Sequence, residues 1–84
     1  MNRAFSQVTV VTVTYNSSAI IDALARTLDR FQNVIAIDNA SRDGTAAALM
    51  QRLPQARVIG NTANLGFGPA NNQAVSLEIG RAHV

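Results

Sequence analysis

Polar side chains that could bind a ligand follow three apolar runs of the sequence. The first set comes directly after VTVVTV, the second ends the run NVIAID, and the third lies within NTANLGFGPANNQA. Together they offer amides, hydroxyls, one carboxylate and the bare backbone of a glycine, groups that suit the hydrogen bonds of a base and a ribose. Three sets of residues are therefore candidates for a binding site: Thr14, Tyr15 and Asn16, then Asp38 to Ser41, and then Asn61 to Asn72.

The elements that must position these residues begin with a strand over residues 8–16. The segment is dense in β-branched residues and apolar enough to be covered on both faces, which predicts a central parallel strand. Ser17 and Ser18 are candidate caps of a helix that runs to about Arg30. Apolar residues recur at helical spacing within it, at Ile20, Ile21, Leu24, Leu28 and Phe31.

The rest of the chain repeats this alternation. A second strand over residues 34–37 leads into a helix that Thr45 can cap and Pro54 stops, and a third strand follows over residues 57–60. A third helix is expected near Pro69. Strand, helix, strand, helix and strand in this order predict an α/β fold, half of a doubly wound parallel sheet.

In such sheets, ligands bind outside the carboxyl ends of the strands, so the three polar sets should converge at one edge. Each set also has a purely structural interpretation. Residues 14–16 could simply end a strand, and Asp38 could cap backbone amides of its loop. We assign Asp43 and Gly44 first to architecture, as a tight turn in which glycine supplies a positive φ.

Several functional classes are disfavoured. Gly66 and Gly68 suggest a dinucleotide fingerprint, but its last position falls on Asn71 and the segment follows the third strand instead of the first. The seven arginines are scattered, which argues against nucleic-acid binding. The chain has no cysteine, which fits a reducing cytosol, and its apolar runs are far shorter than a membrane span of about 20 residues.

The three blocks VTVVTVTYN, VIAIDNASRDGT and NLGFGPANNQA, in this order, resemble the start of a family 2 glycosyltransferase with the GT-A fold. The resemblance extends from Val8 to about Ala74. It implies the amino-terminal half of a Rossmann-like parallel sheet, here incomplete. The second and third blocks are most similar to rhamnosyltransferase-like members that act on bacterial cell-surface glycans.

The resemblance also implies roles for the candidate residues. Residues 14–16 would line the nucleotide pocket, while Asp38 and Asn39 would approach the base and ribose. Many relatives have a second acid at the position of Asn39, and this exchange leaves the choice between uridine and thymidine open. Asn64, Gly66 and Asn71 match positions that wrap the donor. Asn71 stands where relatives often have an arginine, so a charge contact with the diphosphate from that position is in doubt.

The family's reaction would be a direct, inverting displacement at the anomeric carbon. The donor would be a sugar, rhamnose among the candidates, linked to dTDP or UDP, and the acceptor a glycan or a lipid-linked glycan. A divalent metal, magnesium or manganese, is expected in the full-length enzyme but not bound by this fragment, and the catalytic base is expected beyond it. We expect a cytoplasmic protein, or one peripheral to the inner face of the membrane, that transfers no sugar on its own.

The last residues suggest a domain limit at residue 77. Residues 78–84, EIGRAHV, resemble a sequencing-library adapter translated in frame, so we expect residues 1–77 to be the nucleotide-sugar-binding part and residues 78–84 to be non-native. His83, the single histidine, would then have no catalytic role. The alternative function is a non-catalytic nucleotide-binding α/β module.

Overall fold

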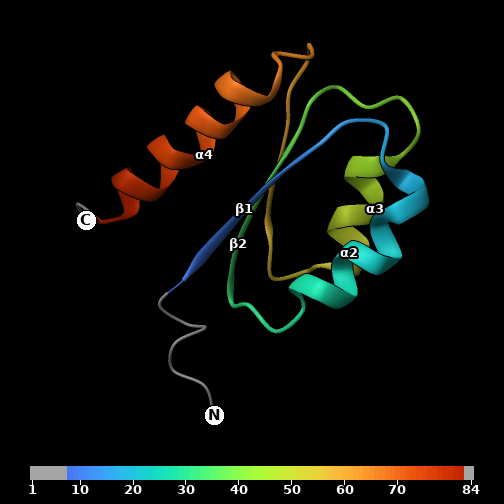
Figure 1. Cartoon of the computed structure of the whole chain (residues 1–84), viewed down its shortest axis with the longest axis horizontal. Helices are drawn as coiled ribbons and strands as arrows, with labels where there is room; N and C mark the ends of the chain where they lie inside the picture. Colours follow the sequence, from blue (N-terminus) through green and yellow to red (C-terminus); the bar gives the residue numbers. More distant parts are fainter. Residues whose placement is uncertain (1–7, 83–84) are drawn as a thin grey trace.

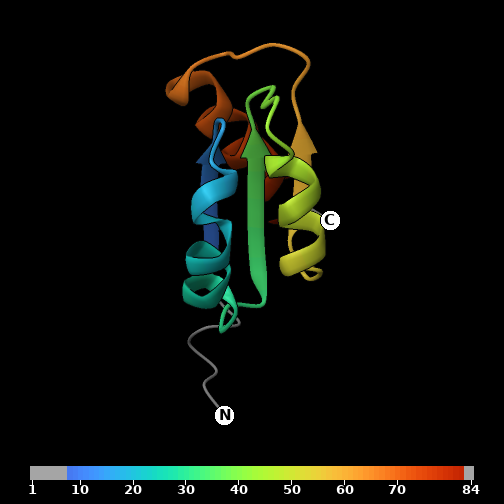
Figure 2. The ribbon, with the colours of Figure 1, turned by 90° about the vertical axis from the view of Figure 1, so that its right-hand side faces the viewer.

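The computed structural model describes residues 8–82, with side chains as far as Leu77. Its three strands are parallel and lie in the order β1-β2-β3: β1 (Thr9–Thr14), β2 (Asn33–Asp38) and β3 (Arg57–Gly60). In Figure 2 the three strands stand side by side with their carboxyl ends at the top. The α/β fold with a parallel sheet, expected from the sequence, is confirmed.

Helices cover both faces of this sheet. They are η1 (Ser18–Ile20), α2 (Ile21–Leu28), α3 (Thr45–Arg52) and α4 (Phe67–Ala82). The first three lie on one face, where they connect β1 to β2 and β2 to β3, and α4 lies on the other face against β1 and β2 (Figure 1). The chain therefore crosses from one face to the other only after β3 within the described residues.

Within the described sheet, β2 lies between β1 and β3. Every residue of β2 after Asn33 is buried, whereas β1 is half-buried up to Thr14 and lies at an edge of the described sheet. The density of β-branched residues in β1 fits a strand whose two faces are covered by helices.

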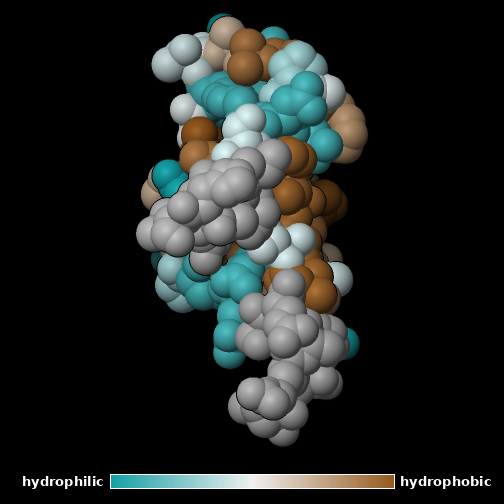
Figure 3. Space-filling model, turned by 90° about the vertical axis from the view of Figure 1, so that its left-hand side faces the viewer, coloured by the Kyte–Doolittle hydropathy of each residue, from teal (hydrophilic) through white to brown (hydrophobic). Residues whose placement is uncertain are grey.

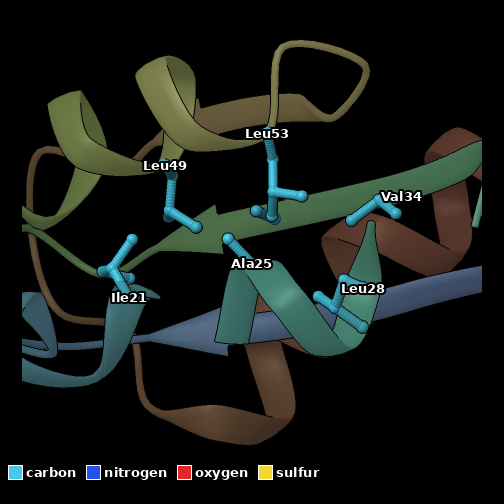
Figure 4. Packing of buried hydrophobic residues seen from close by; sticks show 7 residues of the cluster. Ile21, Ala25, Leu28, Val34, Leu49 and Leu53 are labelled. Carbon is cyan, nitrogen blue, oxygen red and sulfur yellow. The ribbon is translucent and has the colours of Figure 1, made fainter. Parts of the chain in front are cut away.

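The larger core cluster lies between the sheet and the helices α2 and α3. Figure 4 shows its side chains pointing toward one another from α2, β2 and the α3 segment. Leu49 and Leu53 are completely buried there. Pro54 follows Leu53 and α3 ends at Arg52, as the sequence predicted. The labelled members are Ile21, Ala25, Leu28, Val34, Leu49 and Leu53.

The opposite face has a thinner core because a single helix covers it. Ile35 and Ile37 of β2 pack there against Ala70 and Ala74 of α4, whose small side chains let the helix approach the sheet closely. Seen from the α4 side in Figure 3, apolar surface remains exposed beside the helix. An apolar hollow of about 390 Å³ lies between β3 and α4, lined by Ile59, Gln73, Ser76 and Leu77.

Helix starts differ from the sequence prediction. Ser17 stands at the cap position of η1 and Ile20 at that of α2, but neither makes a side-chain cap hydrogen bond. Thr45 is the first residue of α3, and the cap is Gly44 in the left-handed conformation. The first backbone N–H groups of η1 and α3 instead donate to Asp43. The contact with Thr45 is local, but the contact with Ser18 joins loops 25 residues apart, which local sequence rules could not reveal.

The segment after β3 positions the third polar set. It crosses over the carboxyl ends of the strands before α4 begins, as Figure 2 shows at the top of the sheet. Pro69 lies in the first turn of α4, where its missing N–H costs no helical hydrogen bond. The crossing segment therefore lies at the carboxyl ends of the strands, the edge where open α/β sheets bind ligands.

Candidate functional site

A cleft of about 570 Å³ lies at the carboxyl end of the sheet. Its walls come from the loops that follow each of the three strands. Polar groups predominate among its lining residues, and Tyr15 offers an aromatic ring that is 53% exposed. The lining residues are Tyr15, Ala40, Ser41, Arg42, Thr62, Ala63 and Asn64.

Two of the candidate residues, Tyr15 and Asn64, line this cleft directly. The side-chain oxygen of Asn64 accepts a hydrogen bond of 2.8 Å from the backbone N–H of Gly66. Gly66 has a φ of +83°, so the loop turns there in a conformation that favours glycine. The Asn64 amide nitrogen is left as the group that can donate to a ligand.

Asp38 lies beneath the cleft, with only 2% of its surface exposed. Its carboxylate accepts hydrogen bonds from the Thr14 hydroxyl at 2.8 Å and from the Ser41 hydroxyl at 2.6 Å. A third bond of 3.0 Å comes from the Ser41 backbone N–H. Asp38 therefore joins the ends of β1 and β2 to the loop that carries Ser41, the structural role that the sequence left open for it.

Asn39 is equally buried and holds the third polar set in place. Its amide nitrogen donates to the Gly66 carbonyl at 3.0 Å, and its oxygen accepts from the Asn61 amide at 2.9 Å. Asn61 in turn forms two amide hydrogen bonds with Gln73 of α4. This network ties the crossing segment to the sheet. A carboxylate at residue 39 could accept from Asn61 but could not donate to Gly66.

Asn16 braces the loop after β2 from the loop after β1. Its backbone N–H donates to the Ser41 hydroxyl oxygen at 2.8 Å, and its side-chain oxygen accepts from the Arg42 backbone N–H at 2.9 Å. The sequence predicted that Asn16 lines the pocket; in the structure it is exposed and is not among the lining residues, but it bonds to two of them. Asn71, also predicted, lies half-buried on α4 and does not line the cleft.

Backbone strain is concentrated beside the cleft. Asn16 and Ala40 have φ angles of +47° and +61°, in the left-handed region that residues other than glycine seldom adopt. Asparagine tolerates this region, but for alanine the conformation costs roughly 1–2 kcal/mol. Strain of this kind persists where surrounding contacts fix the backbone, and it is frequent at ligand sites.

Asp43 fixes the far side of the same loop. Hydrogen bonds from the side chain and backbone of Thr45 and from the backbone of Ser18 lower the pKa of the Asp43 carboxyl from 3.8 to about 2. The Thr45 hydroxyl oxygen accepts from the Ser17 N–H at 2.8 Å. Asp43 and Gly44, with its φ of +82°, therefore have the architectural role expected from the sequence.

Sequence reasoning missed several residues that line the cleft. Arg42 was counted among scattered arginines, although its position directly after a strand-end loop was a signal for it. Thr62 and Ala63 lie in the crossing segment, but no motif distinguishes them there. Ala40 has a positive φ, but because the residue is not a glycine, the sequence did not indicate that conformation.

The cleft thus combines an aromatic face, hydroxyl and amide donors, and one guanidinium among the described residues that line it. An aromatic face can stack on a base, amides and hydroxyls can bind base edges or a ribose, and a guanidinium can bind an anion. Among the described residues, no helix has the length and apolar character needed to cross a bilayer.

Comparisons with known proteins show which family the chain is similar to. The sequence model of the family described as Glycosyl transferase family 2 matches residues 9–79. The chain is also 37% identical over 71 residues to the N-acetylglucosaminyl-diphospho-decaprenol L-rhamnosyltransferases of two Mycobacterium tuberculosis strains, CDC 1551 / Oshkosh and H37Rv. That alignment covers 80% of this chain and 23% of each relative. No solved structure matches the chain significantly.

The family match covers all three strands, both connecting helices and the loops that form the cleft. The rhamnosyltransferase-like resemblance of the second and third blocks is confirmed by the two relatives. The family match ends at residue 79 and α4 ends at Ala82. Neither end point tests the domain limit that the sequence suggested after residue 77. This chain belongs to glycosyl transferase family 2.

Proposed function

We propose that this chain is the nucleotide-sugar-binding part of an inverting glycosyltransferase, and that the cleft at the sheet edge binds the nucleoside diphosphate of the donor. The observation that carries the proposal is the cleft itself, which combines Tyr15, Asn64 and Arg42 at the carboxyl ends of parallel strands in a chain of this family. A nucleotide needs an aromatic face, hydrogen-bonding groups and a cation, and all three are present.

We further propose that the donor is dTDP- or UDP-linked and that the sugar is rhamnose. The support is the printed name of the two relatives, each an L-rhamnosyltransferase of a diphospho-decaprenol acceptor, together with the 37% identity. By the same reasoning, the acceptor proposed here is a glycan or a lipid-linked glycan at the cytoplasmic face of the membrane. Because the chain spans 23% of the relatives' length, these are proposals for the whole protein.

The divalent metal proposed for the whole enzyme does not fit the described carboxylates. Asp38 and Asp43 already accept hydrogen bonds on both oxygens, and within the described residues no group of three or more acidic, histidine or cysteine side chains could hold an ion. We therefore assign no step of the reaction to a metal held here. The chain's own contribution is to bind and orient the nucleotide.

Thermal unfolding tests the proposed binding. At a concentration 100 times its Kd, a ligand stabilises the folded state by about 2.7 kcal/mol. For a domain of this size, that raises Tm by roughly 10 °C or more. We expect UDP or dTDP to produce such a shift and NAD to produce none. If NAD stabilises the chain as well as UDP and dTDP do, the proposed ligand is wrong.

A matched pair of variants locates the effect. Ala63→Trp places an indole in the cleft, whereas Ala23→Trp places the same group on the exposed surface of α2. The first should abolish the shift caused by UDP or dTDP, and the second should retain it.

In a coupled assay with a nucleotide-linked rhamnose and a lipid-linked acceptor, we expect no turnover by the 84-residue chain. Measurable turnover would contradict its assignment as a binding part alone.

A further inference from the structure

The cleft contains a positive charge with no partner among the described residues. Arg42 lines the cleft with six neutral residues, and its guanidinium forms no ion pair within the part of the chain that the structure describes. The neighbouring acid, Asp43, directs its carboxylate oxygens to Thr45 and Ser18 instead. The guanidinium is thus free to meet an anionic group in the cleft.

The backbone that carries Arg42 is held on both sides. Its N–H donates to the Asn16 side chain at 2.9 Å, and the preceding residue, Ser41, is bonded to Asp38 through both its N–H and its hydroxyl. A fixed backbone lowers the entropy lost when the side chain orders on a ligand. The backbone of Arg42 is therefore fixed at the cleft, while its exposed side chain has no partner among the described residues and can bind a ligand.

The third polar set cannot supply this charge. Residues 61–77 include no lysine or arginine, and Asn71 lies on α4 outside the cleft lining. On the sheet side of the cleft, Asp38 is buried and its oxygens are occupied. Any phosphate group bound among the described residues of the cleft would have Arg42 as its cationic contact.

Resting on the function proposed above, we propose that Arg42 binds the diphosphate of the nucleotide and so makes the cleft select nucleoside diphosphates over nucleosides. A guanidinium matches phosphate geometry with two parallel N–H donors and stays charged at all physiological pH values. The positive charge of this site comes from the loop after β2.

The test compares UDP with uridine, and dTDP with thymidine, by isothermal titration calorimetry on the 84-residue chain. EDTA is present so that no metal bridges the phosphates. The variants are Arg42→Gln and, as a matched control, Arg57→Gln, which removes an exposed arginine at the start of β3, at the opposite end of the sheet. Circular dichroism verifies that both variants fold.

We expect Arg42→Gln to weaken binding of the diphosphate by about 10-fold, the equivalent of one charge-assisted contact, while nucleoside binding changes less than about twofold. Arg57→Gln should change neither. The loss should shrink as salt increases, because screening weakens an exposed charge contact.

Two results would overturn the inference while leaving the nucleotide site intact. If Arg42→Gln weakens nucleoside and diphosphate binding equally, Arg42 contacts the base or the ribose. If Arg42→Gln weakens neither, Arg42 does not contact the nucleotide. Wild-type protein that binds neither a diphosphate nor a nucleoside would contradict the proposed function itself.

Discussion

At the scale of single residues, the contact between Thr14 and Asp38 holds the floor of the cleft. Both side chains are almost fully buried, and the Thr14 hydroxyl donates to the Asp38 carboxylate at 2.8 Å. A buried carboxylate that loses a donor still bears the free-energy cost of its removal from water. Loss of this hydrogen bond should therefore destabilise the fold by more than the bond itself contributes to stability.

Thr14→Val should reduce the free energy of unfolding by about 1–3 kcal/mol, because it leaves the buried Asp38 carboxylate with one donor fewer. Urea denaturation measures the change. Thr12→Val is the control, since Thr12 lies in the same strand and its side chain forms no hydrogen bond in the described structure. Equal effects of the two substitutions would show that the hydroxyl of Thr14 is not what matters.

The Asp43 carboxyl is the second residue whose environment makes a measurable prediction. Hydrogen bonds, first that from the Thr45 side chain, lower its pKa from 3.8 to about 2. A lowered pKa in the folded state means that the contribution of Asp43 to stability is present above pH 3.8 and is lost as the pH falls through about 2. Acid unfolding in this window should therefore depend on Thr45.

Thr45→Ala should raise the pKa of the Asp43 carboxyl from about 2 toward 3.8, because the largest cause of the shift is removed. Thr45→Ser keeps the hydroxyl and should leave the pKa close to that of the wild type. NMR titration of the Asp43 carboxyl carbon gives both values. If the pKa stays near 2 in Thr45→Ala, the hydroxyl is not its cause.

At the scale of elements, the sequence predicted those limits of helices and strands that depend on a few neighbouring residues. The strand at residues 57–60 and the helix that ends before Pro54 have their predicted limits, because periodicity and proline act over a few residues. The contact by which Asp43 caps Ser18 was missed, since it joins two distant segments of the chain.

The candidate site divides in the same way. The three polar sets do converge at the carboxyl ends of the strands, which topology alone required. Which side chains line the cleft could not be predicted, because Asp38 and Asn39 are buried and bond to partners in other segments. Their burial depends on those partners, which lie in other segments of the chain.

Gly44 makes an element-scale prediction, because it links β2's loop to α3 at a φ of +82°. No atom lies within 4 Å of the position that a Cβ would take there, so Gly44→Ala tests backbone conformation alone. We expect a loss of about 1–2 kcal/mol in the free energy of unfolding.

Gly60→Ala is the matched control for that substitution. A Cβ at residue 60 would also meet no atom within 4 Å, and Gly60 does not have a positive φ. Because alanine restricts the unfolded chain more than glycine does, Gly60→Ala should leave stability unchanged or raise it slightly. Equal losses at the two positions would contradict the assignment of the Gly44 effect to its left-handed backbone.

At the scale of the whole molecule, the larger core and the cleft lie in different parts of the sheet. The face under α2 and α3 contains the larger core, while the carboxyl edge, where polar loops meet, contains the cleft. The amide chain from Asn39 through Asn61 to Gln73 connects that edge to α4 on the other face. Folding of the crossing segment and formation of the cleft are therefore coupled.

The central claim is that this edge binds a nucleoside diphosphate, and NMR mapping tests it most directly. The ¹⁵N-labelled chain is titrated with UDP and with dTDP, and amide shifts are followed. We predict that one of them perturbs the amides of Tyr15, Ser41, Arg42 and Asn64 while those of the solvent-facing residues of α2 and α3 stay unchanged. Perturbations confined to other surfaces, or none with either nucleotide at millimolar concentration, would contradict the account.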